Sequence, residues 1–315
     1  MTNPIEAEDL TRVFGDLTAV NSINLSVNEG EVFGFLGPNG AGKSTAVRML
    51  TTLLKPSDGS AKVSGYDVAT EANMVRKNIG VALQDAAIDP LMTGNELLKL
   101  QAVLHGIPRQ EGRARCAELL ERVGLTAAGD KRVGTYSGGM RRRLDLALSL
   151  VHRPKVLFLD EPTTGLDPTS RVALWEEVRT LNKEIGTTVF LTTQYLEEAD
   201  QLAQRIAIID NGRIVREGSP ATLKAGVGAP TLRVDITDAD FVAAKEIMNK
   251  LGEERPARKG RIAIGLDGGT RAITAVLKAL EDQDIEVQHV ELDEPSLDDV
   301  FADATGRRLE GGENT

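Results

Sequence analysis

The residues best suited to chemistry form a glycine-rich turn that ends in a lysine and two hydroxyl groups, in the order G-x-x-x-x-G-K-S-T. The turn lies between an apolar segment at residues 32–36 and a segment with helical periodicity. Glycines let backbone N–H groups converge on an anion, and the start of a helix adds positive potential. This pattern predicts a site for a nucleoside triphosphate, in which the lysine reaches the β- and γ-phosphates and the serine holds Mg²⁺. Its residues are Gly37, Pro38, Asn39, Gly40, Ala41, Gly42, Lys43, Ser44 and Thr45.

Two adjacent carboxylates, Asp160 and Glu161, follow a second apolar run at residues 156–159. Charges at the end of a buried strand are costly unless a metal or protons are handled there. We expect Asp160 to bind Mg²⁺ and Glu161 to polarise the water that attacks the γ-phosphate. Acidic pairs at strand ends also serve as caps. Their combination with the glycine-rich turn at residues 37–45, called the phosphate loop below, favours catalysis.

A second glycine-containing turn, Ser137-Gly138-Gly139, opens a predicted helix 23 residues before Asp160. A serine-capped helix start is another anion-binding end. One triphosphate does not need two such ends from the same chain, so we expect this one to face the nucleotide of a second subunit. The tripeptide alone is common in loops, and its order between the other motifs makes it specific.

Gln194 lies in a polar hinge, residues 192–194, between an apolar strand and an acidic helical segment. It is either a loop amide or a group that the strand delivers to the reacting centre. An amide can donate to a γ-phosphate oxygen but cannot carry a proton as imidazole does.

Apolar strands alternate with helical segments along most of the chain, which predicts an α/β fold with a mainly parallel sheet covered on both faces. The predicted strands are residues 23–27, 32–36, 79–83, 156–159, 188–191 and 206–209, and the predicted helices are 45–54, 97–104, 113–123, 139–150 and 171–185. The mostly helical stretch around residues 85–150 is expected to be an insertion. A Gly/Pro-rich boundary near 218–230 precedes a β-α-β-α-β pattern and a last helix at 296–304, which predicts a small α+β domain.

Composition limits the function classes. Of the 315 residues, 41% are apolar and 3% aromatic, so aliphatic packing must dominate the core. The net charge of −10 and the lack of a basic patch argue against a nucleic-acid partner. The acidic start does not resemble a secretory signal, and no apolar run reaches the roughly 18 residues needed to span a bilayer. The lone Cys116 is typical of a reducing compartment.

With these motifs in this order, residues 5–220 resemble the ATP-binding subunits of ABC transporters, which are P-loop NTPases. The resemblance implies ATP and Mg²⁺ as ligands, Gln84 as a further Mg²⁺ contact that links nucleotide to insertion, Phe14 stacked on adenine, and Asp167 across the seam of a homodimer. Phe14 as simple core filler is the alternative. The expected domains are an ATP-binding domain at 1–222 and an accessory domain at 230–309.

The family usually has a histidine where this chain has Gln194. That departure, together with residues 295–301 and 305–307, resembles the daunorubicin/doxorubicin-resistance branch. The resemblance implies export of a drug, antibiotic or lipid-like compound. It also implies a peripheral place at the cytoplasmic face of the membrane, with a separate permease docked on the insertion around residues 85–135.

Two other classes compete with a transporter subunit. A soluble ABC protein acting on ribosomes or DNA would have two nucleotide domains or long coiled coils, and this chain shows neither. A GTPase or small-molecule kinase is disfavoured by residues 137–140. The segment N-K-E-I at residues 182–185 also lacks, at its fourth place, the aspartate that guanine selection would need. The role of the C-terminal segment, in dimerisation, permease contact or passive support, stays open.

Overall fold

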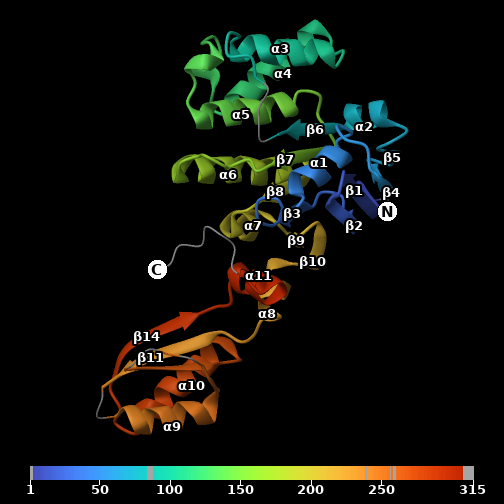
Figure 1. Cartoon of the computed structure of the whole chain (residues 1–315). Coiled ribbons are helices and arrows are strands. Elements are labelled where there is room, and N and C mark those ends of the chain that lie inside the picture. Colours follow the sequence, from blue (N-terminus) through green and yellow to red (C-terminus); the bar gives the residue numbers. More distant parts are fainter. Residues whose placement is uncertain (1–2, 84–87, 238–239, 256, 258–259, 308–315) are drawn as a thin grey trace. The chain divides into compact units, whose positions relative to one another are not determined.

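The computed structural model of the chain describes residues 3–83, 88–237, 240–255, 257 and 260–307 (Figure 1). The chain forms two compact units, a first that extends to Pro220 and a second that begins at Ala221. Each unit has a hydrophobic core of its own. Among the helices of the described residues, none combines the length and apolarity required to cross a bilayer.

Six strands form the central sheet of the first unit, in the order β10-β9-β3-β8-β7-β6. They are β10 (Arg213–Gly218), β9 (Arg205–Asp210), β3 (Val32–Leu36), β8 (Thr188–Thr193), β7 (Val156–Asp160) and β6 (Ile79–Ala82). The strands from β9 to β6 are parallel, and β10 pairs antiparallel with β9. The central strands β3, β7 and β8 are buried along their whole length, as expected for a sheet covered on both faces. The predicted α/β class with a mainly parallel sheet is confirmed.

A second, antiparallel sheet in the first unit was not predicted. Its order is β2-β1-β4-β5, with β1 (Ile5–Phe14), β2 (Leu17–Val27), β4 (Asp58–Val63) and β5 (Tyr66–Asp67). Only residues 23–27 were expected to be a strand, and they form the end of β2. The other strands mix polar and apolar residues because part of each strand is exposed to solvent.

Helices cover both faces of the central sheet. Helix α1 (Lys43–Leu50) shares a core with β1, β2 and one side of the sheet, including Phe33, Phe35 and Phe158. The predicted extension of α1 to residue 54 is wrong, because the helix ends at Leu50 and Thr52 adopts a left-handed φ of 66°. The short α2 (Ala72–Asn78) precedes β6.

The other side of the sheet packs against a helical layer. Alternate strand residues such as Leu157 and Leu159 share a core with α3, α4, α5 and α6. These helices are α3 (Gly94–Leu104), α4 (Arg109–Arg122), α5 (Gly138–Ser149) and α6 (Pro168–Ile185), and α7 (Leu196–Leu202) follows β8. A capping box between Thr93 and Glu96 starts α3. The predicted helices in this region are confirmed, with starts a few residues earlier than expected.

The second unit contains an antiparallel sheet in the order β12-β13-β11-β14. Helix α8 (Pro220–Ala225) begins at Pro220, the residue to which the first unit extends. The other elements of the second unit are β11 (Thr231–Ile236), α9 (Phe241–Leu251), β12 (Glu253–Glu254), β13 (Arg261–Gly265), α10 (Gly269–Glu281), β14 (Val287–Asp293) and α11 (Leu297–Thr305). The order β-α-β-β-α-β with β11 between β13 and β14 is that of a split β-α-β fold. The predicted small α+β unit is confirmed, with the added short strand β12.

Candidate functional site

The backbone of the glycine-rich turn between β3 and α1 lies close to the backbone of two other segments, at Ile209 and at Ala19. A Cβ added to Gly37 would lie 2.3 Å from the carbonyl oxygen of Ile209, and one on Gly42 would lie 2.4 Å from that of Ala19. Gly42 also has a φ of 107°, which side chains disfavour. Among the residues that the structure describes, no side chain caps the first turn of α1, so its N–H groups can bind an anion.

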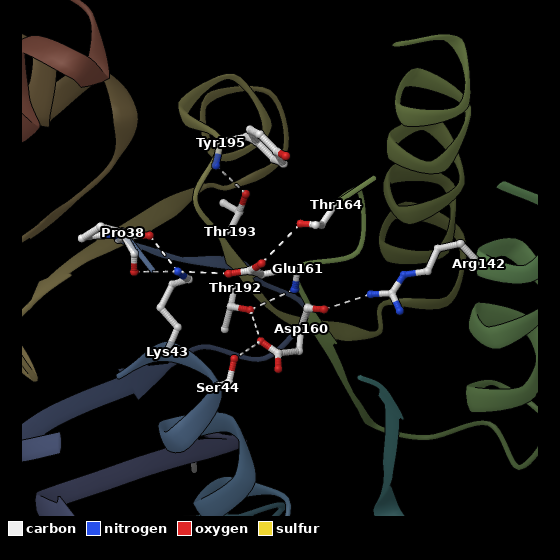
Figure 2. Close-up of polar contacts among 11 residues, drawn as sticks. Pro38, Lys43, Ser44, Arg142, Asp160, Glu161, Thr164, Thr192, Thr193 and Tyr195 are labelled. Atoms are coloured by element: carbon white, nitrogen blue, oxygen red, sulfur yellow. Dashed lines mark hydrogen bonds and ion pairs between the residues drawn. The ribbon is translucent and has the colours of Figure 1, made fainter. Parts of the chain in front are cut away.

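Lys43 is the cation of this turn, and its ammonium group is held on three sides (Figure 2). Its Nζ donates to the carbonyl oxygens of Gly37 at 2.8 Å and Pro38 at 2.9 Å. The same Nζ lies 3.1 Å from Oε1 of Glu161, with the two side chains only 3% and 4% exposed. Lysine and glutamate, 118 positions apart in the sequence, therefore form a buried ion pair at the predicted site.

Asp160, the last residue of β7, points toward the start of α1. Its Oδ1 accepts hydrogen bonds from Ser44 Oγ at 3.1 Å and from Thr192 Oγ1 at 2.6 Å. Carboxylate and hydroxyl oxygens are the hard donors that Mg²⁺ prefers. The pair Ser44 and Asp160 therefore fits a magnesium ion beside the phosphate loop.

Glu161 is held in an unusual backbone conformation, with a left-handed φ of 47°. Its N–H donates to both the carbonyl oxygen and Oγ1 of Thr192, each at 3.1 Å, and Oε2 accepts from Thr164 Oγ1 at 3.3 Å. These contacts turn the carboxylate from the strand end toward Lys43 (Figure 2). A strained residue held by its neighbours is a common sign of a functional site.

The hinge that contains Gln194 lies beside the phosphate loop. The N–H of Gly37 donates to the carbonyl oxygen of Thr193 at 3.2 Å, and β8 pairs with β3 on one side and β7 on the other. Gln194 follows Thr193 directly and is half-buried. The strand order thus brings the chain at Gln194 next to both the loop and the carboxylates.

The serine-glycine turn starts α5 as predicted. Ser137 caps the helix by accepting from the N–H of Met140 at 3.2 Å, and Ser137 and Gly138 are exposed. A Cβ on Gly139 would lie 2.8 Å from Oγ of Ser170, and Ser170 in turn donates to Asp167, the cap of α6. These hydrogen bonds lower the pKa of Asp167. The structure therefore places the turn and Asp167 side by side on an exposed surface.

Two further predicted residues have different outcomes. Phe14, at the end of β1, is 43% exposed with the Arg12 guanidinium 4.5 Å from its ring centre, so it is not core filler. Gln84 lies outside the described residues. Sequence reasoning missed Thr192 and Arg142, both of which contact Asp160. The paired hydroxyls of Thr192 and Thr193 at a buried strand end were the available signal for the first.

Comparison with known proteins decides the family. The family model "ABC transporter" matches residues 20–164, and the model "ATP-binding protein DrrA1-3-like, C-terminal domain" matches residues 218–305. The chain is 45% identical to the daunorubicin resistance ATP-binding protein DrrA2 of Streptomyces coeruleorubidus, over 98% of this chain and 97% of that protein. The chain belongs to the ATP-binding subunits of ABC transporters. The subunit is thus a nucleotide-binding ATPase.

Other relatives and solved structures agree. The subunit is 44% identical to the doxorubicin resistance ATP-binding protein DrrA of Mycobacterium tuberculosis, over 91% of the subunit and 88% of that protein. It is 35% identical to the linearmycin resistance ATP-binding protein LnrL of Bacillus subtilis, over 97% and 99%. Among solved structures, cbiO1 from Clostridium perfringens has a TM-score of 0.66 and 29% identity, over 71% of the subunit and 92% of cbiO1. The cassette MJ0796, solved as a dimer in a post-hydrolysis state with ADP and Pi, has a TM-score of 0.63 and 26% identity, over 68% and 98%.

Proposed function

We propose that this subunit hydrolyses ATP to drive export of a drug, antibiotic or lipid-like compound through a separate permease, from the cytoplasmic face of the membrane. The proposal rests on a buried cluster at the predicted site. In it Lys43 forms an ion pair with Glu161, and Ser44 donates a hydrogen bond to Asp160. Relatives named for resistance to daunorubicin, doxorubicin and linearmycin support the compound class.

Transport in membrane vesicles tests this function. Inverted membrane vesicles that contain a permease and the subunit are expected to accumulate daunorubicin when ATP is added. No accumulation is expected without ATP, or when the Lys43→Met variant replaces the native subunit. ATP hydrolysis without drug accumulation would exclude this cargo. Co-sedimentation with ribosomes or DNA in place of membranes would favour a non-transport partner.

The contacts of the described residues, together with the family resemblance, support the following roles at the reacting centre. Lys43 holds the β- and γ-phosphates, Glu161 accepts the proton of the attacking water, and Phe14 stacks on the adenine. Ser44 and Asp160, with Gln84, hold Mg²⁺, which when bound neutralises charge on the phosphates. Glu161 must exchange its contact with Lys43 for one with water, and an arriving phosphate favours this exchange because it competes for the same ammonium group.

Gln194 acts on the γ-phosphate as an amide donor. The Gln194→Ala variant is expected to hydrolyse ATP about tenfold more slowly, since one hydrogen bond of roughly 1–1.5 kcal/mol is lost. The Gln194→His variant is expected to remain active, with turnover more sensitive to pH near about 6.5, the ordinary pKa of imidazole, than that of the native subunit. Steady-state rates from pH 5.5 to 8.5 measure both. If Gln194→Ala abolishes turnover while Glu161→Gln leaves it intact, the two roles are inverted.

Two subunits enclose two ATP molecules, each phosphate loop facing residues 137–139 of the other subunit, with Asp167 at the seam. The exposure of Ser137 and Gly138 beside the exposed Asp167 supports this arrangement. ATP stabilises the closed dimer because it contacts both subunits, and hydrolysis removes that preference.

The Gly138→Asp variant tests the dimer. No atom of the described part of the chain lies within 4 Å of a Cβ at Gly138. A carboxylate in the first turn of a helix stabilises it by about 0.3–1 kcal/mol. The melting temperature should therefore hold or rise. Light scattering with ATP should show loss of the dimer, because the new charge repels the phosphates of the facing subunit. Gly138→Ser is the neutral control, and an ATP-dependent dimer of normal affinity in Gly138→Asp would contradict the arrangement.

The permease docks on the insertion, where α3 and the turn before it expose apolar side chains. These are Leu91, Leu100, Val103 and Leu104. Surface patches of this kind mark interaction sites more often than isolated apolar residues do. The exposed surface belongs to the stretch of residues 85–135 that the family resemblance implies for docking.

The Val103→Glu variant tests the docking surface. Val103 is 72% exposed, so the substitution should change the free energy of unfolding by no more than about 0.5 kcal/mol. Co-purification with the permease should fall while the ATPase rate of the isolated subunit stays unchanged. Val242→Glu on α9 is the matched control, since Val242 is 71% exposed and lies in the second unit. Equal binding by both variants would place the docking surface elsewhere.

A further inference from the structure

Arg142 connects the helix that starts at the serine-glycine turn with the strand ends of the reacting centre. Its side chain, from α5, is only 10% exposed. Nε donates to the carbonyl oxygen of Pro162 at 2.8 Å, Nη2 to that of Asp160 at 2.9 Å, and Nη1 to that of Leu83 at 2.6 Å. Nη1 also donates to Oδ2 of Asp145, one turn further along α5, at 3.2 Å. Figure 2 shows the guanidinium directed at Asp160.

Each of the three carbonyl groups belongs to a residue that is adjacent in sequence to Glu161 or Gln84. Those of Asp160 and Pro162 belong to the residues on either side of Glu161. That of Leu83 follows β6 and directly precedes Gln84. Because Glu161 has a left-handed φ of 47°, its neighbours must be held to keep its carboxylate in place. A single guanidinium holds both of them.

Charge reinforces this arrangement. Burial lowers the pKa of Arg142, while the carboxylates of Asp145, Asp160 and Glu198 act in the opposite direction. Burial raises the pKa of Asp145 to about 6 against the opposing effect of Arg142. Arg142 and Asp145 lie within ion-pair distance, with Nη1 and Oδ2 3.2 Å apart. A planar guanidinium with five donors can satisfy several carbonyls at once, whereas an ammonium group cannot match that geometry.

We infer that Arg142 is a positioning residue for hydrolysis, which sets the place of the Glu161 carboxylate and ties it to the helix that the facing subunit's nucleotide contacts. This inference rests on the proposed roles of Glu161 and of residues 137–139. The guanidinium thus joins α5 to the turn at residues 160–162. The contacts of Arg142 given above are with protein groups, three carbonyl oxygens and the carboxylate of Asp145.

The test compares Arg142→Lys with Arg143→Lys in the purified full chain. Arg143 is on the same helix and half-buried, but its guanidinium donates to the carbonyl oxygen of Val123, away from the strand ends. Arg142→Lys is expected to lower kcat about 10–100-fold with KM for ATP within about threefold, because misplacement by roughly 1 Å costs about 10² in rate. Arg143→Lys should keep kcat within about threefold. Rates are expressed per ATP bound, so a partly unfolded preparation does not imitate the effect.

A double-mutant cycle separates positioning from general support of the fold. In the Glu161→Gln background, single-turnover hydrolysis should change less than about threefold on adding Arg142→Lys, since the carboxylate to be positioned is gone. A full further 10–100-fold loss there, or an unchanged kcat for Arg142→Lys alone, overturns the inference. If Glu161→Gln itself retains native turnover, it is the proposed base that fails, and the two failures are distinguishable.

Discussion

The Glu161→Gln variant is expected to hydrolyse ATP about 10²–10⁴-fold more slowly than the native subunit, the range typical for loss of a general base. The substitution keeps the size of the side chain and leaves Lys43, Ser44 and Asp160 in place. Affinity for ATP should rise, because a neutral amide competes less well than a carboxylate for the Lys43 ammonium, which lies 3.1 Å from Glu161. The two effects have opposite signs, and a general loss of structure cannot produce that combination.

Three measurements check this expectation. Single-turnover hydrolysis gives the rate, equilibrium titration with a fluorescent ATP analogue gives the affinity, and light scattering shows whether ATP accumulates a long-lived dimer. Glu197→Gln on α7 is the matched control, because it makes the same chemical change at an exposed glutamate. A variant that keeps its turnover, or that loses affinity and rate together, contradicts the role assigned to Glu161.

The Lys43→Met variant is expected to lose both ATP binding and stability. Lys43 and Glu161 are almost completely buried, and removing one partner of such a pair typically costs about 3–5 kcal/mol because the other charge stays uncompensated. The Lys43→Met/Glu161→Gln double variant should recover most of that stability, since it leaves no unpaired carboxylate. Neither variant should bind ATP with native affinity, because the phosphates lose their cation in both.

Urea unfolding of the native subunit, the two single variants and the double variant measures this cycle. The free energies of unfolding should be strongly non-additive, with the double variant more stable than Lys43→Met. Additive free energies would mean that the 3.1 Å contact is not an important interaction in the folded subunit. Nucleotide titration of the same four proteins separates the loss of binding from the loss of stability.

The part of the fold that sequence predicted best is the central sheet. Strands such as β7 and β8 are buried at every residue, so their apolar runs are continuous and easy to identify. The antiparallel sheet was missed except for residues 23–27, because β1 and β4 have exposed positions filled by polar residues. Hydrophobic periodicity also placed the end of α1 at residue 54, whereas the helix ends at Leu50. The left-handed φ of Thr52 ends the helical conformation there, and no proline or glycine marks this end in the sequence.

Sequence by itself determined the chemistry of this subunit. The phosphate loop, the adjacent carboxylates and the serine-glycine turn are contiguous motifs, whose function depends on local backbone geometry that short segments encode. Tertiary structure alone decided how the motifs meet. Parallel pairing of β3, β8 and β7 aligns their ends, so that Lys43 reaches Glu161 and Thr192 reaches Asp160. Arg142 acquired its proposed role only because helix packing brings its guanidinium to the ends of β6 and β7, a contact that spacing along the chain does not specify.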